Sequence, residues 1–431
     1  MARIVLTCWG SHGDVDPFLG LGVALRARGH DVTVATIEYY RAIVLGAGLA
    51  FHPIRPHVDP TDTVLIERIM DRNRGGEFLL RQVLFPAVDD MFADVDAAAS
   101  GADLLVSHPI TMATPIVAEY RRIPWANAVL APTSMFSTYD VPVIPAAPWL
   151  KPLDRLGHWP GMLIVGLLRR ATHGWAAPVF ALRQRLGLAP GGNPVLEGQH
   201  SPSLVLALYS RLLGDPQPDW PPHVVVTGHV FYDAPHGTTL PAELESFLGD
   251  GPPPVVFTLG SSVVLIARNF WRESVAAITR LGARAVLLAG PEHVRLVEEA
   301  FGGSVGDAGR AGILAVDRAP HSRLFPRASV VVHQCGIGTM AQSLRSGRPM
   351  LGVPFAHDQP DNAWRAQRLG MSRTLYPSAY RAPRIAAALQ LLQHEPVYSA
   401  AAARVARELG AETGAAAACD ALEQTFRLRR S

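Results

Sequence analysis

The sequence has little lysine or cysteine and lacks any apolar run long enough to span a membrane. Lys151 is the only lysine, so arginine carries nearly all of the positive charge. The three cysteines, Cys8, Cys335 and Cys419, are far apart in the chain and lack the spacing of metal ligands. This excludes a disulfide framework and fits a reducing cytoplasm. The apolar stretch at 162–168 is far shorter than the roughly 20 residues that cross a bilayer.

The sequence also has no large excess of positive or negative charge. The formal net charge is +2 and no basic stripe is interleaved with aromatic residues, so we expect no nucleic-acid partner. The N-terminus lacks the features of a signal peptide and residues 3–8 indicate a strand, so we expect a cytoplasmic location. His52 and His57 have no third ligand at a suitable spacing, so we expect neither a metal site nor a cofactor.

Short apolar runs alternate with helical stretches along most of the 431 residues. A chain of this length exceeds one compact core, and the alternation predicts an α/β protein with two parallel, helix-covered sheets. Strands are expected at 3–8, 31–36, 103–107, 125–130, 255–259, 285–288, 313–316, 330–333 and 350–353. Proline and glycine indicate a connector near 235–252. The predicted parts are an N-terminal domain at 1–235, a linker at 236–252, a C-terminal domain at 253–410 and a final helix in 411–431.

A glycine loop follows the apolar run at 328–332, and a helix is expected after it at 340–346. Free N–H groups at a helix start, together with the helix dipole, form a seat for a pyrophosphate. The residues of this loop that we expect to contact such a ligand are His333, Cys335, Gly336, Gly338 and Thr339. The alternative for His333 is a buried strand-end histidine with a satisfied ring.

Polar side chains also follow the last and the first predicted strands of the C-terminal domain. Asp358 and Gln359 suit sugar hydroxyls, and the alternative is that they cap the next helix. Thr258 and Ser261, with Ser262 as a substitute, could reach phosphate oxygens.

Together these blocks resemble the family 1 glycosyltransferases of GT-B fold. The matching blocks follow the family order and lie at 10–18, 200–202, 256–261, 318–320 and 333–359. The chain is similar to bacterial members, which include antibiotic glycosyltransferases and the rhamnosyltransferase of rhamnolipid synthesis. This resemblance implies two Rossmann-like domains whose parallel sheets face each other across a cleft. It also implies that the nucleotide-sugar donor binds to the C-terminal domain, that the acceptor binds to the N-terminal domain, and that the last helix returns to the N-terminal domain.

Two residues after the first strand are candidates for the general base. The implied reaction needs a base to take the proton of the acceptor hydroxyl, a contribution worth roughly 10²- to 10⁴-fold in rate. Counting back from Pro17, Asp14 stands at the family's catalytic position, although it could instead cap the helix expected near Pro17. His12 has the better intrinsic pKa but lies two positions away. We favour Asp14 and keep His12 as the second candidate.

The resemblance assigns further contacts to the donor. Arg318 replaces a tryptophan that stacks on the nucleotide base in plant relatives, and a guanidinium can stack similarly. Backbone groups at Ala319, Pro320 and His321 would then read the edge of the base. Uridine and thymidine carriers both stay open, with thymidine slightly favoured.

On the acceptor side, His108 stands where plant relatives have an aspartate, and it cannot act as that carboxylate. It could contact Asp14 or the acceptor, or merely end its strand. A proline-broken insert at 140–176 resembles the family's acceptor lobe, in which Trp149 and Trp159 would line an apolar pocket. The alternative is that both tryptophans pack beneath an irregular loop. The charge pattern of the insert is too mild to indicate binding to a membrane surface.

We therefore expect a metal-independent glycosyltransferase that moves a hexose or deoxyhexose from a dTDP or UDP carrier to a hydroxyl of a small apolar acceptor. A single displacement with one base predicts inversion at the anomeric carbon. A nucleotide-sugar epimerase and a non-catalytic auxiliary protein that binds a sugar nucleotide are the alternatives. A dehydrogenase is excluded, because the turn at 10–14 lacks the G-x-G-x-x-G spacing. The sequence gives no indication of the oligomeric state.

Overall fold

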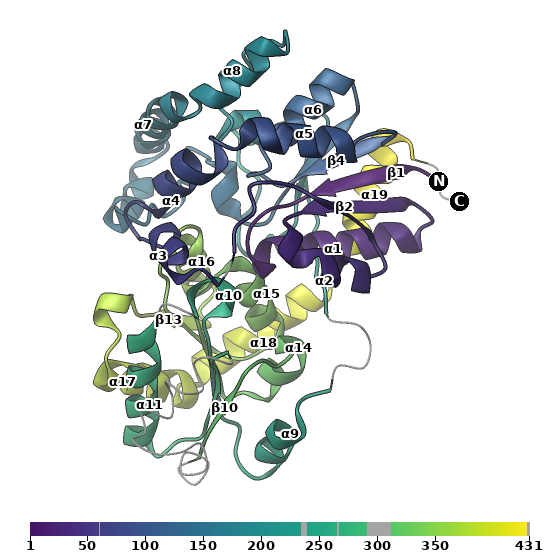
Figure 1. The fold of residues 1–431 in the computed structure, drawn as a ribbon. Coiled ribbons are helices and arrows are strands. Elements are labelled where there is room, and N and C mark those ends of the chain that lie inside the picture. The colour runs from purple at the N-terminus through teal and green to yellow at the C-terminus, as the bar shows by residue number, and fades with distance from the viewer. Residues whose placement is uncertain (60, 234–238, 265–266, 291–311, 429–431) are drawn as a thin grey trace. The chain divides into compact units, whose positions relative to one another are not determined.

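The computed structural model describes residues 1–59, 61–233, 239–264, 267–290 and 312–428. The chain forms two compact units, each built around its own parallel sheet (Figure 1). Unit 1 consists of Met1–Asp59, Asn73–Tyr232 and Glu412–Ser431, and unit 2 of Pro60–Arg72 and Asp233–Ala411. The expected α/β fold with two sheet-based domains is confirmed. The sequence did not indicate that a short segment of the N-terminal half belongs to unit 2.

The sheet of unit 1 has seven parallel strands in the order β3-β2-β1-β4-β5-β6-β7. They are β1 (Arg3–Thr7), β2 (Asp31–Thr36), β3 (Ala50–Pro53), β4 (Leu104–Ser107), β5 (Trp125–Val129), β6 (Val205–Ala207) and β7 (Val224–Val226). The strand order reverses between β1 and β4, which is where ligands of open parallel sheets collect. The sequence predicted β1, β2, β4 and β5, but it missed β3, β6 and β7.

The sheet of unit 2 has six strands in the order β10-β9-β8-β11-β12-β13. They are β8 (Val255–Thr258), β9 (Ala285–Leu288), β10 (Ile313–Val316), β11 (Val330–His333), β12 (Met350–Gly352) and β13 (Ser372–Thr374). Alternate residues of β8 enter separate apolar clusters, with Val255 and Phe257 in one and Val256 in the other. The sheet is therefore buried on both faces, which explains why its strands read as continuous apolar runs.

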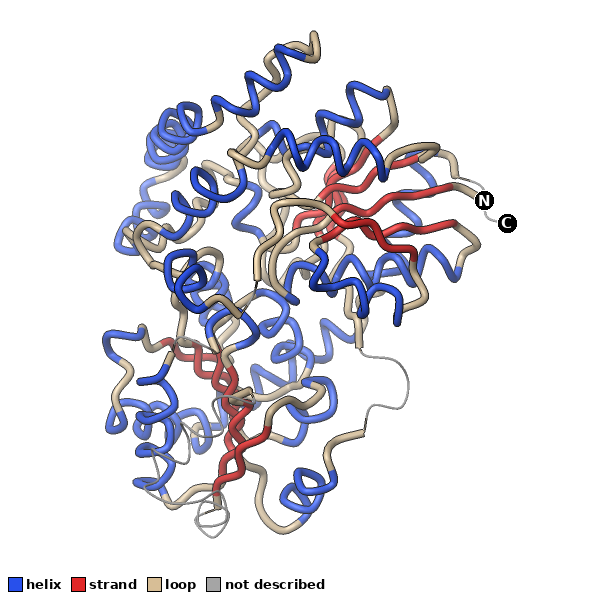
Figure 2. The backbone as a smooth tube through the Cα atoms, in the orientation of Figure 1, coloured by secondary structure: helices blue, strands red, loops and turns tan. Residues whose placement is uncertain are grey.

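Helices surround the strands of each sheet (Figure 2). The α-helices described in unit 1 are α1 (His12–Ala27), α2 (Arg41–Gly46), α4 (Gly75–Phe78), α5 (Val88–Ala98), α6 (Ala113–Arg121), α7 (Trp159–Trp175), α8 (Ala177–Arg185) and α19 (Gly414–Phe426). Those of unit 2 are α3 (Thr63–Ile69), α9 (Ala242–Gly249), α10 (Gly260–Val263), α11 (Arg268–Leu281), α14 (His321–Leu324), α15 (Ile337–Arg345), α16 (Gln359–Arg368), α17 (Ala382–His394) and α18 (Pro396–Gly410).

Helix α1 begins well before the position that the sequence indicated. Its N-cap is Ser11, whose N–H and hydroxyl both donate to the carboxylate of Asp14, at 2.7 and 3.0 Å. Pro17 lies inside the helix rather than at its start. The expectation of a loop up to Pro17 was wrong, because hydrogen bonds between a serine N-cap and an acid three residues later stabilise a helix start there.

The C-terminal helix α19 packs against α1 within unit 1. Arg28 at the end of α1 donates to Asp420 at 2.6 Å and to Glu423 at 2.8 Å, and His30 lies 3.2 Å from Glu423. A Cβ on Gly414 would stand 2.1 Å from the carbonyl oxygen of His229, so only glycine permits this close approach. These contacts fix the last helix to unit 1.

Helix α3 contributes apolar side chains to unit 2. Ile66 and Met70 are buried in the cluster that contains Phe257, and the guanidinium of Arg72 lies 4.8 Å from the ring centre of Tyr376. Asp62 caps the helix by accepting from the N–H of Leu65. The segment is therefore an integral part of the core of unit 2.

Ile66→Ala should destabilise unit 2 by about 2 kcal/mol or more, because it removes buried methyl and methylene groups and leaves a cavity. Val64→Ala is the control, since Val64 lies on the same helix but is exposed, and its cost should stay within about 0.5 kcal/mol. Urea unfolding followed by circular dichroism measures both. Equal effects of the two substitutions would show that α3 is not packed as described.

Candidate active site

The carboxylate of Asp14 lies at the carboxyl edge of the sheet of unit 1. The chain leaves β1 at Thr7 and turns at Gly10, whose φ of +132° and contact with Asp14 leave no room for a side chain. A Cβ at Gly10 would stand 2.3 Å from Oδ2 of Asp14. The turn and the hydrogen bonds from Ser11 thus hold the carboxylate in one place.

Burial raises the pKa of Asp14 from 3.8 to about 6, against the lowering effect of the hydrogen bonds from Ser11, and the nearby charge of Asp16 adds to the rise. The side chain still keeps 32% of its exposure, so solvent moderates the shift. At neutral pH most of Asp14 is ionised, and its pKa is close enough to neutrality for a useful general base.

His108 faces the same carboxylate from the end of β4. Its Nε2 lies 3.7 Å from Oδ1 of Asp14, and its ring meets the edge of Phe18. Burial lowers the pKa of His108 to about 3, so the imidazole is neutral. Its Nδ1 is buried and has no hydrogen-bond partner among the described residues. The structure therefore brings His108 and Asp14 together as a neutral ring beside an ionised acid.

His12 lies in the first turn of α1, where its Nδ1 is 3.4 Å from Oδ1 of Asp16. The rings of Tyr39 and Tyr40 approach it edge-on, at centroid distances of 6.5 and 5.1 Å. The side chain is half-buried against these three groups. His12 is thus near Asp14 in the chain but is directed to a different carboxylate.

The two tryptophans predicted to contact the acceptor are exposed. Trp149 keeps 72% of its surface and Trp159 keeps 52%. Such exposure does not fit a tryptophan packed beneath a loop, and the contact with an acceptor stays a prediction. Both residues belong to an exposed apolar surface.

In unit 2, the glycine loop connects β11 to α15 as expected. Gly336 is the N-cap of α15 and no side chain caps the first turn, so its N–H groups can serve an anionic ligand. Cys335 has a φ of +68°, a conformation that costs a residue other than glycine roughly 1 kcal/mol or more. Gly338 and Thr339 lie in the first turn of the helix.

The phosphate contact expected of His333 does not fit the structure. The ring is fully buried, its Nδ1 accepts from the N–H of Cys335 at 3.1 Å, and its Nε2 lies 3.3 Å from the sulfur of Met350. Burial lowers its pKa to about 3. Both ring nitrogens are engaged inside the unit, so the geometry corresponds to the satisfied strand-end histidine.

Gln334 is the polar residue of this loop that the sequence reasoning missed. Its amide is buried, its Nε2 lies 3.4 Å from the hydroxyl of Thr339, and its Oε1 has no partner among the described residues. A Cβ on Gly260 would stand 2.3 Å from Nε2 of Gln334, so the amide lies between the loops that follow β8 and β11. Its place directly after the strand, in a glycine loop, was the available signal.

Thr258 ends β8, and its hydroxyl accepts weakly from the N–H of Gly260 at 3.4 Å. The residue is buried, so it shapes the turn that leads to α10. The backbone of Ser261 and Ser262 belongs to α10, whereas their side chains lie outside the described part of the structure.

Asp358 and Gln359 lie at the start of α16. Gln359 is buried, and its Oε1 accepts from the N–H groups of Phe355 and Ala356, at 2.8 and 3.3 Å. Asp358 accepts from the Nδ2 of Asn362 at 2.7 Å, and its side chain does not cap the helix. The side-chain oxygen of Gln359 thus accepts hydrogen bonds from its own loop. Its side-chain nitrogen, Nε2, is the group that could contact a ligand.

The loop after β10 carries the residues expected to bind the nucleotide base. Arg318 is exposed, with Asp317 at 3.8 Å as its nearest acid. Ala319 and Pro320 are partly buried, and the ring of His321 stacks on Phe325 at 4.4 Å. Burial lowers the pKa of His321 to about 4, so it adds no positive charge to this loop at neutral pH.

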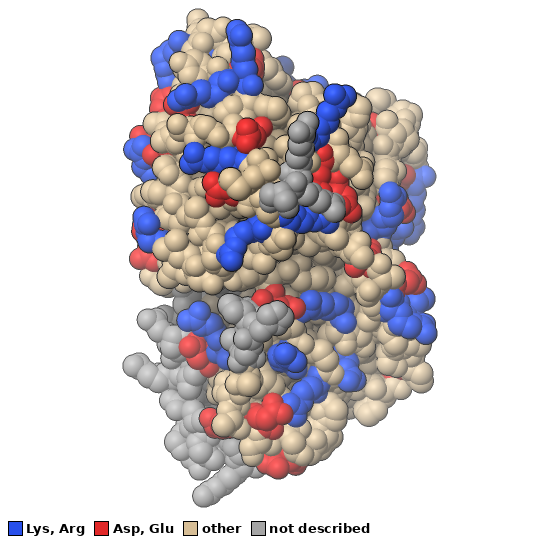
Figure 3. Space-filling model, turned by 90° about the vertical axis from the view of Figure 1, so that its right-hand side faces the viewer, with Lys and Arg blue, Asp and Glu red and all other residues tan. Residues whose placement is uncertain are grey.

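Arginine and acidic side chains are interspersed over the face of the molecule shown in Figure 3. Within the described ranges, no three His, Cys, Asp or Glu side chains gather closely enough to hold a metal ion.

No helix among the described residues combines the length and apolar character needed to cross a membrane.

Two family models match the chain. Residues 4–133 match the glycosyltransferase family 28 N-terminal domain, and residues 306–424 match the erythromycin biosynthesis protein CIII-like C-terminal domain. The O-mycaminosyltylonolide 6-deoxyallosyltransferase of Streptomyces fradiae is 33% identical over 98% of this chain and 97% of its own length. A sterol 3-beta-glucosyltransferase of Cryptococcus neoformans is 29% identical over 86% of this chain, but this match covers only 24% of that protein.

Solved structures share the fold over almost the whole chain. The glycotransferase of kitacinnamycin has a TM-score of 0.70 at 22% identity and covers 98% of both chains. The spinosyn rhamnosyltransferase complexed with thymidine diphosphate has a TM-score of 0.67 at 19% identity, over 99% of this chain and 100% of that one. At this identity the likeness concerns the fold.

The raised pKa of Asp14 predicts a stability effect with a defined sign. Between about pH 4 and pH 6 the folded protein holds a proton on Asp14 that the unfolded chain has lost, so this group makes the native protein less stable as the pH rises through that window. Asn bears no charge and can still accept from Ser11. The melting temperature of Asp14→Asn relative to the native protein should therefore rise through this window and stay constant above it. Asp215→Asn, at an exposed aspartate of the same unit, is the control. A difference that falls with pH would contradict the burial of Asp14.

Proposed function

Because the chain belongs to the bacterial family 1 glycosyltransferases of GT-B fold that act on natural products, we propose that it transfers a hexose or deoxyhexose from a dTDP- or UDP-sugar to a hydroxyl of a small apolar acceptor. The observation that carries the proposal is the ionised Asp14 beside the neutral ring of His108, at the carboxyl edge of the sheet of unit 1. Such a group can accept a proton from a hydroxyl bound at that edge.

In the proposed reaction the acceptor oxygen attacks the anomeric carbon of the donor sugar. The new C–O bond forms as the bond to the diphosphate oxygen breaks, the diphosphate leaves with that electron pair, and the hydroxyl proton passes to Asp14. One displacement without a covalent intermediate inverts the anomeric configuration. His12 remains the second candidate for the base.

Neutral donors in unit 2 support binding of the diphosphate. The N–H groups of the first turn of α15 and the amide of Gln334 lie in one loop, and the helix dipole favours a negative charge there. His333 is buried and His321 partly buried, and the pKa of each is lowered, so they add no positive charge at neutral pH. The leaving group is proposed to be stabilised by these amides without a metal ion.

Similar proteins support a choice of nucleotide carrier and of acceptor class. The glycosyltransferase VinC and the spinosyn rhamnosyltransferase were each solved with thymidine diphosphate, which favours a dTDP carrier over UDP. The sterol named for several relatives supports an apolar acceptor. Exposed Arg318 is proposed to stack on the base of the carrier.

Thymidine diphosphate should raise the melting temperature of the protein more than uridine diphosphate does, while NAD should have no effect. A ligand at a hundred times its Kd contributes about 2.7 kcal/mol, which a thermal-shift assay resolves. Gln334→Leu should weaken this binding roughly tenfold, because it removes one buried hydrogen-bond donor. Gln367→Leu, at an exposed glutamine of α16, is the control. Equal stabilisation by NAD and the diphosphates would remove the basis for the donor site.

Asp14→Asn should lower kcat by roughly 10²- to 10⁴-fold, whereas His12→Ala should keep most of the activity. The native rate should fall as the pH drops below about 6, because protonated Asp14 cannot accept the hydroxyl proton. Transfer of a radiolabelled sugar to an acceptor panel measures these rates. Loss of transfer in His12→Ala alone would make His12 the base. Isomerised sugar without any acceptor would indicate an epimerase, and donor binding without transfer by the native protein would indicate an auxiliary role.

A further inference from the structure

Helix α7 is apolar on its buried side and on its exposed side. The buried side is fixed closely to unit 1, since a Cβ on Gly161 would stand 2.1 Å from the carbonyl oxygen of Thr138. Pro160 and Val165 are buried on the same side. Thr138 itself is held by Asp219, which accepts from its N–H and its hydroxyl at 2.6 and 2.7 Å. The orientation of the helix is therefore determined by close packing.

The opposite side of α7 is exposed and apolar. Trp159, Met162, Leu163 and Leu167 follow helical spacing, and Leu163 and Leu167 keep 61% and 69% of their surface. Trp149 and Leu156, on the preceding 3-10 helix (Pro148–Leu156), are exposed as well. We call these six residues the α7 apolar face. It extends ~12 Å along the helix, and a contiguous exposed apolar patch of this kind marks an interaction site.

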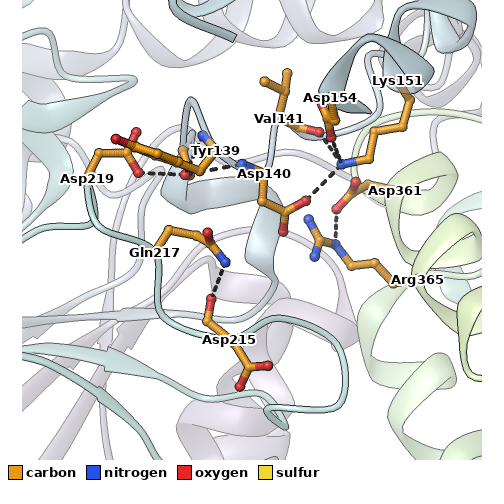
Figure 4. A network of polar contacts seen from close by, with 11 residues as sticks. Tyr139, Asp140, Val141, Lys151, Asp154, Asp215, Gln217, Asp219, Asp361 and Arg365 are labelled. Atoms are coloured by element: carbon orange, nitrogen blue, oxygen red, sulfur yellow. Dashed lines mark hydrogen bonds and ion pairs between the residues drawn. The ribbon is translucent and has the colours of Figure 1, made fainter. Parts of the chain in front are cut away.

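The charges around the α7 apolar face are unbalanced in favour of arginine. The two acids nearest to it in the sequence, Asp140 and Asp154, each lie 2.8 Å from the buried ammonium of Lys151, which also donates to the carbonyl of Val141 at 2.6 Å (Figure 4). Arg155 and Arg170 are exposed and have no ion pair among the described residues. Because Lys151 neutralises both acids, Arg155 and Arg170 leave a net positive charge at the edge of the face. The composition of the segment alone did not reveal this charge.

We propose that the α7 apolar face docks on the surface of a lipid bilayer that carries anionic headgroups. Exposed tryptophan and leucine side chains with arginines at their edge are the composition of a helix that lies in the membrane interface without crossing it. Arg155 and Arg170 would meet the headgroup phosphates while the apolar side chains enter the acyl boundary. A small acceptor would need a concave site, whereas this face is the convex side of a helix, so we do not assign it to a small acceptor. Two copies joined through this face would bring like charges close together.

The proposal is independent of the proposed sugar transfer, because none of the six residues belongs to the base or to the donor loop. Co-sedimentation of the full chain with vesicles tests it. The protein should bind vesicles containing phosphatidylglycerol more strongly than vesicles of phosphatidylcholine alone, and added salt should reduce the difference.

The double variant Leu163→Ser and Leu167→Ser should weaken binding to the phosphatidylglycerol vesicles at least tenfold, because it replaces two highly exposed apolar side chains of the face with polar ones. Leu45→Ser is the matched control, since Leu45 keeps 52% of its surface on α2 of the same unit, and it should bind like the native protein. Arg170→Gln should weaken binding to the anionic vesicles only. Thermal unfolding of each variant checks its fold.

Three results would overturn the proposal. One is the absence of binding by the native protein to either vesicle. Another is native-like binding by the double variant. The third comes from sedimentation velocity: a native dimer that the double variant converts to a monomer, without vesicle binding, would make this face a contact between two copies of the chain.

Discussion

The parallel pairing of neighbouring strands decides which side chains of this protein can meet. In unit 1, β1 pairs with β4 so that Thr7 stands opposite Ser107, and the residues that follow these strands, Asp14 and His108, come to face each other. In unit 2, β8 pairs with β11, and the amide of Gln334 fills the space beside Gly260. Each group of polar residues depends on the carboxyl ends of two adjacent strands, and a shift of register in either sheet would separate its members.

Burial gives these groups different ionisation states. It lowers the pKa of His108 and of His333 to about 3, whereas it raises that of Asp14 to about 6. Desolvation disfavours the charged form in each case. The pKa of the acid thereby moves closer to pH 7, whereas the pKa values of the histidines move further from it. At neutral pH unit 1 therefore holds an ionised carboxylate, while the loop of unit 2 offers polar N–H groups without cationic imidazoles. This division of charge suits a reaction whose proton acceptor and anionic leaving group are held by different parts of the chain.

The sequence predicted the α/β fold and most central strands, because strands buried on both faces are continuous apolar runs. It missed the edge strands β3 and β13, which are mostly not fully buried and so do not form continuous apolar runs. Pro17 indicates a helix start and so predicts a loop at Asp14, but the hydrogen bonds between Ser11 and Asp14 start the helix earlier. The sequence did not reveal that the ring of His333 is engaged inside unit 2 while the amide of Gln334 lies beside Gly260. These arrangements depend on contacts with residues far away in the chain, Met350 for His333 and Gly260 for Gln334.

The two units exchange short pieces of chain. Helix α3 comes from the N-terminal half and fills the core of unit 2, and α19 comes from the C-terminal end and is bonded to α1. Consider a hybrid enzyme that joins the N-terminal half of one relative to the C-terminal half of another at a single crossover near 233. Its α3 would pack in a unit 2 from the other parent, and its α1 would pack against an α19 from the other parent. Recombination that preserves each core needs further junctions around 60, 72 and 412, so that every interior receives all of its segments from one parent.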